Sequence, residues 1–275
     1  LTQTLTQTDR TVIRLSRLLS TPSGTDSTLC TLSYTLTLIH ATLRTRLDTH
    51  LQTLAHSIAT KASSALLPGE TIIASFPPTS GLRRLASTTA AVKALAGLIS
   101  DFRVFVRLWG LLGIYAWARA TWSQPPGDGV VKAITWAQVV VNTLYQGLEN
   151  GAYLASKGVL NSEGWTGERG AKRQARWWAW SSRFWAAHVG LEFVRLGYEW
   201  RRRVVDGVET GDAEKEGKLR KMEDARWWRE SISNMAYAPL TIHWSMEEGV
   251  IGESVVGLLG MVAGGVNLRE RWRQT

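Results

Sequence analysis

The chain has 275 residues, a formal net charge of +9 and 14 tryptophans, several times the usual tryptophan content. Its length is sufficient for one large or two ordinary domains. The single cysteine, Cys30, excludes an intrachain disulfide framework and argues against an oxidising compartment.

The spacing of apolar residues predicts an all-α fold. Sustained alternation with a period of two is absent, whereas spacings of three and four recur along the sequence. We expect a membrane-associated helical bundle with amphipathic helices and about two hydrophobic membrane segments. The expected regions are an N-terminal helical region (1–67), a linker (68–81), an amphipathic helix with the first membrane segment and central helices (82–203), a charged linker (204–226), and a C-terminal membrane segment with a basic tail (227–275).

The first long helix is expected to begin near Thr25, Asp26 or Ser27, each of which can cap it. Its apolar side runs from Leu29 to Ile58, and spacing alone favours a core helix of a bundle over a helix lying on a membrane.

Residues 82–102 form the next amphipathic pattern. Its small-residue middle is typical of helices that lie shallowly in a membrane interface, although a helix packed on a partner explains it equally well. The predicted membrane-inserting side consists of Leu85, Val92, Leu95, Ile99 and Phe102. Headgroup contacts are predicted for Arg83, Arg84 and Lys93.

Residues 104–122 are apolar nearly all round, and their uninterrupted apolar part is too short to span a bilayer unaided. They are read as either a span or a half-buried hairpin, with Trp109 and Trp117 at headgroup depth.

A helix over 129–157, capped by Asp128, follows a proline break. Its polar stripe is expected to be solvated, with interhelical hydrogen bonds as the alternative. The stripe consists of Asn142, Gln146, Glu149, Asn150 and Tyr153.

The stretch ARWWAWSSRFW (175–185) is interpreted as the start of a helix at headgroup depth. Trp177, Trp180 and Trp185 would face lipid or neighbouring helices, and Arg176 and Arg183 would face phosphate. An aromatic contact inside a helical bundle is the alternative.

The last apolar segment, 250–268, carries Gly257, Gly260 and Gly264 on one side. This Gly-x-x-x-Gly spacing permits close helix contact in lipid, so these glycines are the candidate self-association face.

No catalytic constellation is recognisable: the five histidines show no metal-ligand spacing, and no Cys-x-x-Cys motif occurs. We therefore expect neither an enzyme nor a metal or other cofactor. Base stacking on tryptophan would suit a soluble nucleic-acid-binding protein, but such a protein would not need two long apolar segments, so no nucleic-acid partner is expected.

Several long blocks resemble one family. These are LISDFRVFVRLWGLLGIYAWA, WAQVVVNTLYQGLENGAYLASKGVL, WSSRFWAAHVGLEFVRLGYEW and HWSMEEGVIGESVVGLLGMVAG. In this order they are similar to the peroxisomal biogenesis factor 11 (peroxin-11) family, and most of all to its gamma- or C-type fungal branch. The likeness extends from about Thr25 to Trp272 and is weakest at 68–81 and 204–226.

The resemblance implies a peroxisomal membrane protein, with both termini facing the cytosol, that promotes elongation and division of peroxisomes. In that family an amphipathic helix at the position of 82–102 bends the bilayer. The resemblance also implies homo-oligomers, delivery by a peroxisomal membrane-protein import receptor, and fission partners, namely a tail-anchored adaptor and a dynamin-like GTPase. A membrane pore for small metabolites, lined by the polar stripe of 129–157, is the rival activity.

Overall fold

The computed structural model describes residues 2–63, 78–206 and 213–275, and all regular structure in these ranges is helical. This confirms the all-α prediction. The elements are α1 (Thr2–Leu19), α2 (Pro22–Ser63), α3 (Ser80–Val106), the 3-10 turn η1 (Arg107–Trp109), α4 (Gly110–Ser123), α5 (Gly129–Ser156), α6 (Gly167–Asp206), α7 (Ala213–Ser245) and α8 (Glu253–Arg273).

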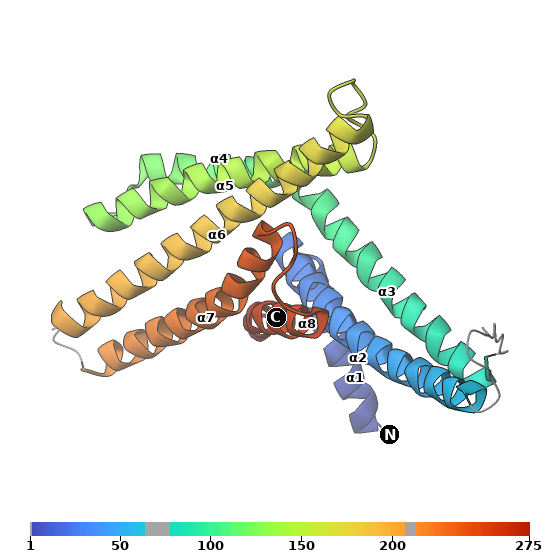
Figure 1. Cartoon of the computed structure of the whole chain (residues 1–275). Coiled ribbons are helices and arrows are strands. Elements are labelled where there is room, and N and C mark those ends of the chain that lie inside the picture. Colours follow the sequence, from blue (N-terminus) through green and yellow to red (C-terminus); the bar gives the residue numbers. More distant parts are fainter. Residues whose placement is uncertain (1, 64–77, 207–212) are drawn as a thin grey trace.

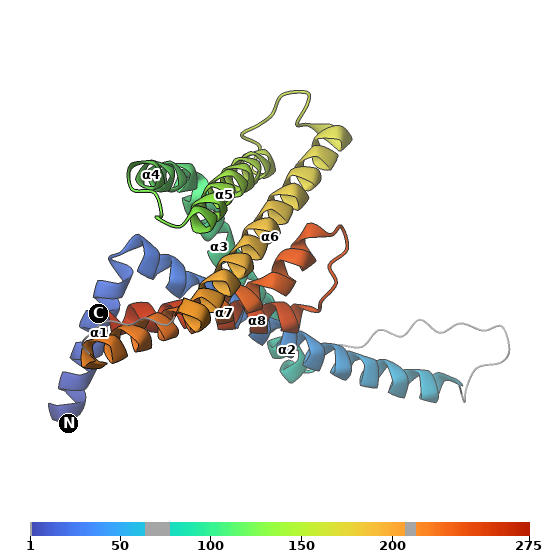
Figure 2. The ribbon, with the colours of Figure 1, turned by 90° about the vertical axis from the view of Figure 1, so that its left-hand side faces the viewer.

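The long helices are arranged in a closed ring (Figure 1). Starting from α2, each neighbour contacts the next in the order α2, α3, η1, α5, α6, α7 and α8, and α8 returns to α2. Helix α4 lies beside α5 outside the ring, and α1 contacts α2 and α8 (Figure 2). The contacts between the long helices therefore form a closed cycle, and side chains from every member of it line one central space.

No helix in the described ranges combines the length and apolar character needed to cross a membrane. The first predicted membrane segment, 104–122, is divided between the end of α3, η1 and the 14-residue α4. The second corresponds to α8, which begins at Glu253 and ends among basic residues.

The start of the first long helix was predicted too late. Helix α2 begins at Pro22, where a fixed φ suits the first helical position, and the Oγ1 of Thr21 accepts a hydrogen bond from the Gly24 amide at 3.1 Å. The preceding α1 lies in the predicted N-terminal helical region (1–67), but a separate helix there was not predicted. The cap of α5 is confirmed, because Asp128 Oδ1 accepts hydrogen bonds from the Val130 and Val131 amides.

The structure describes little of the first predicted linker and contradicts part of the second. Residues 64–77 of the chain lie outside the described ranges, so most of the 68–81 linker is not described. The prediction of a linker over 204–226 is wrong for residues 213–226, because they form the first turns of α7. Its high charge had indicated a solvated linker, but lysine, glutamate, arginine and methionine are also strong helix formers. Residues 207–212 lie outside the described ranges.

The glycines of α8 face α2 of the same chain. Gly257, Gly260 and Gly264 are buried, and a Cβ added at Gly260 would lie 2.2 Å from Cγ of Tyr34. The close approach predicted from the Gly-x-x-x-Gly spacing therefore forms within the chain. The self-association hypothesis needs these glycines to be exposed. In this structure α2 covers them, so α2 would have to move away from α8 first.

Gly260→Ala is accordingly expected to destabilise the fold by about 1–3 kcal/mol, because the new methyl group overpacks the Tyr34 ring. Gly265→Ala is the matched control on the same helix, since a Cβ there meets no atom within 4 Å and alanine favours the helix. Thermal unfolding followed by circular dichroism measures both. Equal melting temperatures for the two variants would contradict the α2–α8 contact.

Candidate functional site

A continuous apolar stripe runs along the outside of α3, across η1 and into α4. Its members are between 46% and 68% exposed. They recur at alternating intervals of three and four residues, which places them on one side of a helix. Large exposed apolar patches in a folded protein mark interaction surfaces. The stripe consists of Leu95, Leu98, Phe102, Phe105, Trp109 and Leu112.

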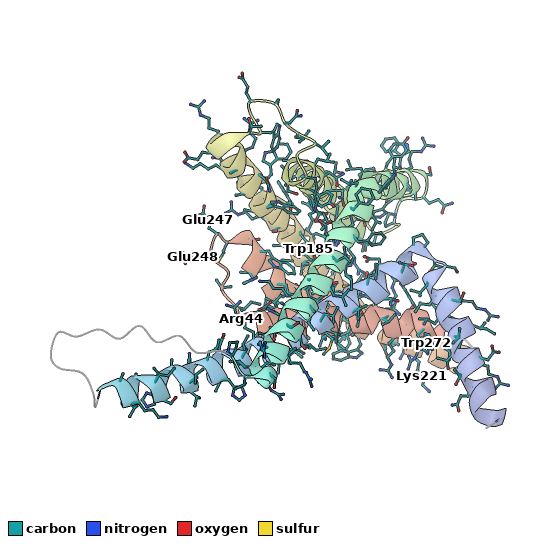
Figure 3. All side chains as sticks on the ribbon, turned by 90° about the vertical axis from the view of Figure 1, so that its right-hand side faces the viewer. Arg44, Trp185, Lys221, Glu247, Glu248 and Trp272 are labelled. Atoms are coloured by element: carbon teal, nitrogen blue, oxygen red, sulfur yellow. The ribbon has the colours of Figure 1, made fainter. Side chains whose placement is uncertain are left out.

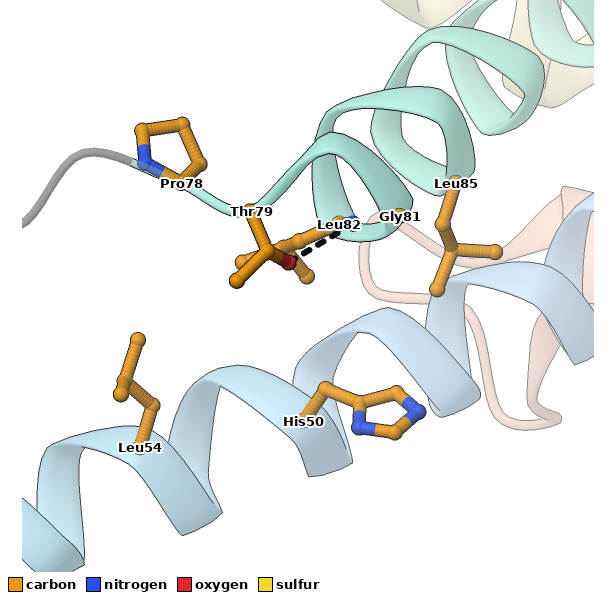
Figure 4. Close-up of a pocket in the computed structure, with 7 residues that line it drawn as sticks. All are labelled: His50, Leu54, Pro78, Thr79, Gly81, Leu82 and Leu85. Carbon is orange, nitrogen blue, oxygen red and sulfur yellow. Dashed lines mark hydrogen bonds between the residues drawn. The ribbon is translucent and has the colours of Figure 1, made fainter.

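The predicted inserting side of 82–102 is only partly exposed. Leu95 and Phe102 belong to the stripe, but Ile99 is buried. Leu85 points toward α2 and lines a groove with His50 of that helix (Figure 4). Val92, at seven-residue spacing from both Leu85 and Ile99, lies on the same side of α3. The outward apolar side is therefore rotated from the predicted one, because α2 covers part of the latter.

The cations of α3 divide into two groups. Arg83 and Arg84, near its start, are exposed and have no hydrogen-bond or ion-pair partner among the described residues. Arg103 instead pairs with Asp26 of α2 at 2.9 Å. Lys93 lies on the opposite side of α3 from the stripe, where it lines the central space. Within the part of the chain that the structure describes, only the first turn of α3 therefore offers cations without a partner next to its outer side.

The polar stripe of α5 is not solvated but lies in a buried hydrogen-bond network, so the expected state was wrong and the alternative is correct. Glu149, 5% exposed, accepts hydrogen bonds from Arg107 Nη2 at 2.9 Å and from the Tyr145 hydroxyl at 3.0 Å. Asn150 Nδ2 donates to the Leu108 carbonyl at 3.1 Å. Burial raises the pKa of Tyr145, which keeps its hydroxyl a donor. This network fixes the η1 turn, and with it the direction of α4, against α5.

A second buried contact joins α5 to α6. Asn142 Nδ2 lies 2.9 Å from Nδ1 of His188, and burial lowers the pKa of His188 although Glu192 opposes this. The folded chain therefore favours the neutral imidazole. Its stabilising contribution is present above the ordinary value of 6.5 and is lost as the pH falls through the lowered folded-state pKa.

We therefore expect the melting temperature to fall more steeply below pH 6.5 in the native chain than in His188→Gln, which cannot titrate there. Melting curves at a series of pH values test this. Parallel pH profiles for the two proteins would show that protonation of His188 does not limit stability.

The tryptophans of 175–185 occupy different environments. Trp177 packs on Gly151 and lies edge-on to Trp165 with centroids 4.9 Å apart. Trp185 stacks on Trp244 at 5.5 Å. Both thus fit the aromatic-contact alternative. Trp180, 45% exposed, remains available to a membrane.

The neighbouring arginines also differ. Arg176 is exposed, whereas Arg183 lies 4.9 Å over the Trp180 ring and its Nε donates to the Ser245 carbonyl. Of the earlier aromatics, Trp109 is exposed and Trp117 is half-buried. A headgroup role for these side chains stays a prediction.

The described residues contain no group of three or more histidine, cysteine or acidic side chains placed to hold a metal ion. Cys30 is buried beside the Tyr237 hydroxyl, and burial raises the pKa of its thiol. His40 pairs with Glu253 at 2.9 Å across the α2–α8 contact. These groups have structural partners.

Sequence reasoning missed Leu98, Phe105 and Leu112 as members of the outer stripe. The signal that could have found them is the uninterrupted three–four spacing from residue 95 to 112, which continues through the boundary drawn after residue 102. It also missed Arg107 as the partner of Glu149.

Comparisons with known proteins give one curated relative and one family. An uncharacterized protein of the fission yeast Schizosaccharomyces pombe is 26% identical over 185 residues, which covers 67% of this chain and 78% of that protein. No solved structure matches significantly. Residues 82–272, which include the outer stripe, the buried network and the glycine side of α8, match the sequence profile named peroxisomal biogenesis factor 11. Since this match covers more than half of its length, the chain belongs to the peroxisomal biogenesis factor 11 family.

Proposed function

We propose that this protein acts at the peroxisomal membrane and promotes elongation and division of peroxisomes by inserting the outer stripe of α3, η1 and α4 into one leaflet. Family membership supports a role in peroxisome biogenesis. The observation that carries the membrane-bending mechanism is the exposed row of Leu95, Leu98, Phe102, Phe105, Trp109 and Leu112.

The geometry suits shallow insertion. An apolar helix side lying in the interface expands one leaflet relative to the other and so favours curvature. Helix α3 and α4 together present such a side, while η1 lets the second helix change direction. Arg83 and Arg84 at the start of α3, which have no partner among the described residues, would hold it to anionic headgroups.

The remaining parts of the proposal follow from the family. The termini face the cytosol, the protein arrives through the peroxisomal membrane-protein import receptor, and homo-oligomers concentrate the inserted helices. A tail-anchored adaptor and a dynamin-like GTPase then complete division. Because the α8 glycines are covered by α2, we place self-association on other surfaces.

Vesicles test the mechanism directly. The purified full chain is expected to convert vesicles containing anionic phospholipid into tubules and to act weakly on purely zwitterionic ones, as seen by electron microscopy. A solute trapped inside should be retained. Leakage without tubulation would instead favour the pore, and vesicles left unchanged would contradict both activities.

A further inference from the structure

The ring of helices borders a cavity of about 540 Å³ that is partly open to solvent. Its walls come from α2, α3, η1, α5, α6, α7 and α8, the same elements that form the ring. Figure 3 places Trp185, one of its lining residues, near the centre of the molecule, whereas Lys221 and Trp272 lie at the edge. The volume lies within the usual range for small-molecule sites. The cavity is therefore a product of the whole architecture.

The charged groups of the cavity are unequally satisfied. Glu149 accepts hydrogen bonds from Arg107 and Tyr145. Glu253 accepts a hydrogen bond from His40 at 2.9 Å. The cations keep unused donors. The buried Nε of Arg107 has no hydrogen-bond partner among the described residues, and Lys93 has none either. An incoming anion can pair with Lys93 and with the solvent-accessible end of the Arg107 side chain, whereas a cation would find the carboxylates already paired.

The opposite wall of the cavity is aromatic. Trp178, Trp185 and Trp244 line it together with Tyr34. Trp185 and Trp244 are nearly parallel, and Tyr34 stacks on Trp244 at 6.4 Å. Such a surface binds apolar groups by area and offers few directional hydrogen bonds. The cavity thus has a cationic side and a broad apolar side.

We propose that this cavity binds one single-chain amphiphile with an anionic head, either a fatty-acid carboxylate or a lysophospholipid phosphate. The head contacts Lys93 and the solvent-accessible end of the Arg107 side chain, and the chain lies on the aromatic wall. A two-chain phospholipid exceeds the volume of the cavity. A nucleotide is disfavoured because the described lining offers two cations and no glycine-rich phosphate loop.

Photoaffinity labelling tests the site in the full chain, reconstituted in phosphatidylcholine nanodiscs. Laurate with a diazirine near its tail is one probe, lauroyl lysophosphatidate with the same group is a second, and the matching dodecanol is the neutral control. At least one anionic probe is expected to label the Trp178, Trp185 or Trp244 peptides saturably. The relative labelling by the two anionic probes distinguishes a carboxylate head from a phosphate head, and dodecanol should label the wall about tenfold less.

Two variants sharpen the result. Gly97 lines the cavity, and a Cβ there meets no atom within 4 Å, so Gly97→Leu should fill the space without disturbing the helix. Gly190→Leu is the matched control, because Gly190 is equally open but lies outside the lining. Lys93→Gln removes one charge from the head site.

We expect Gly97→Leu to abolish labelling of the wall, Lys93→Gln to weaken binding about tenfold, and Gly190→Leu to change nothing. Equal labelling by dodecanol would overturn the anionic head. Wall labelling that persists in Gly97→Leu, or labels confined to the outer stripe in every variant, would overturn the cavity site. The vesicle assay measures insertion of α3 into the membrane. Its outcome is therefore independent of the outcome of the labelling experiment.

Discussion

Leu98→Glu combined with Phe105→Glu is expected to abolish vesicle tubulation while the protein keeps its fold. The two side chains are 67% and 47% exposed, so the folded state loses little packing. Removing two large apolar side chains from the membrane contact costs about 1.5–3 kcal/mol each. That loss corresponds to roughly a hundredfold or greater decrease in membrane affinity, measured by vesicle co-sedimentation beside electron microscopy of tubules.

The charge-matched control is Thr45→Glu combined with Thr49→Glu. These residues are exposed on α2, and the double change adds the same charge to a surface outside the stripe. Tubulation should survive it. If the Leu98 and Phe105 double variant tubulates vesicles as the native chain does, the stripe is not the remodelling element.

Glu149→Leu is expected to destabilise the protein by about 3 kcal/mol, because the partly buried Arg107 guanidinium is left without its carboxylate. The cost lies at the lower end of the usual range for a broken buried pair, since the Arg107 side chain retains 33% exposure. Chemical denaturation followed by circular dichroism measures the free energy of unfolding.

Arg107→Met provides the test of pairing. Added to Glu149→Leu, it removes the unpaired cation, and we expect it to recover most of the lost stability. Tyr145→Phe, which removes one neutral donor to Glu149, should cost only about 1 kcal/mol. Strictly additive losses for Arg107→Met and Glu149→Leu would show that the two charges are not coupled.

The sequence predicted the helical class and several helix boundaries because these depend on local chemistry. Asp128 caps α5 through its own carboxylate, and the proline before it stops α4 locally. The helical part of 213–226 was missed because high charge suits both a linker and an exposed helix. Whether this segment becomes a linker or a helix depends on α6, against which α7 packs.

The candidate site was only half predictable for a related reason. Helix α3 is apolar on two adjoining sides, one with Leu85 and Ile99 and the other with Leu98 and Phe105. Periodicity shows that both exist, but only the position of α2 determines which is covered. The polar stripe of α5 posed the same difficulty, since Glu149 is buried by partners from a different helix.

The closing contact of the ring also has a kinetic consequence. His40 and Glu253 meet across 213 positions of sequence, so the α2–α8 contact can form only after α8 has left the ribosome. Contacts this distant carry a large loop-closure cost and slow folding. Until α8 arrives, the side of α2 around Tyr34 lacks its cover. In a nascent chain this side of α2 therefore stays exposed for as long as it takes to synthesise α8.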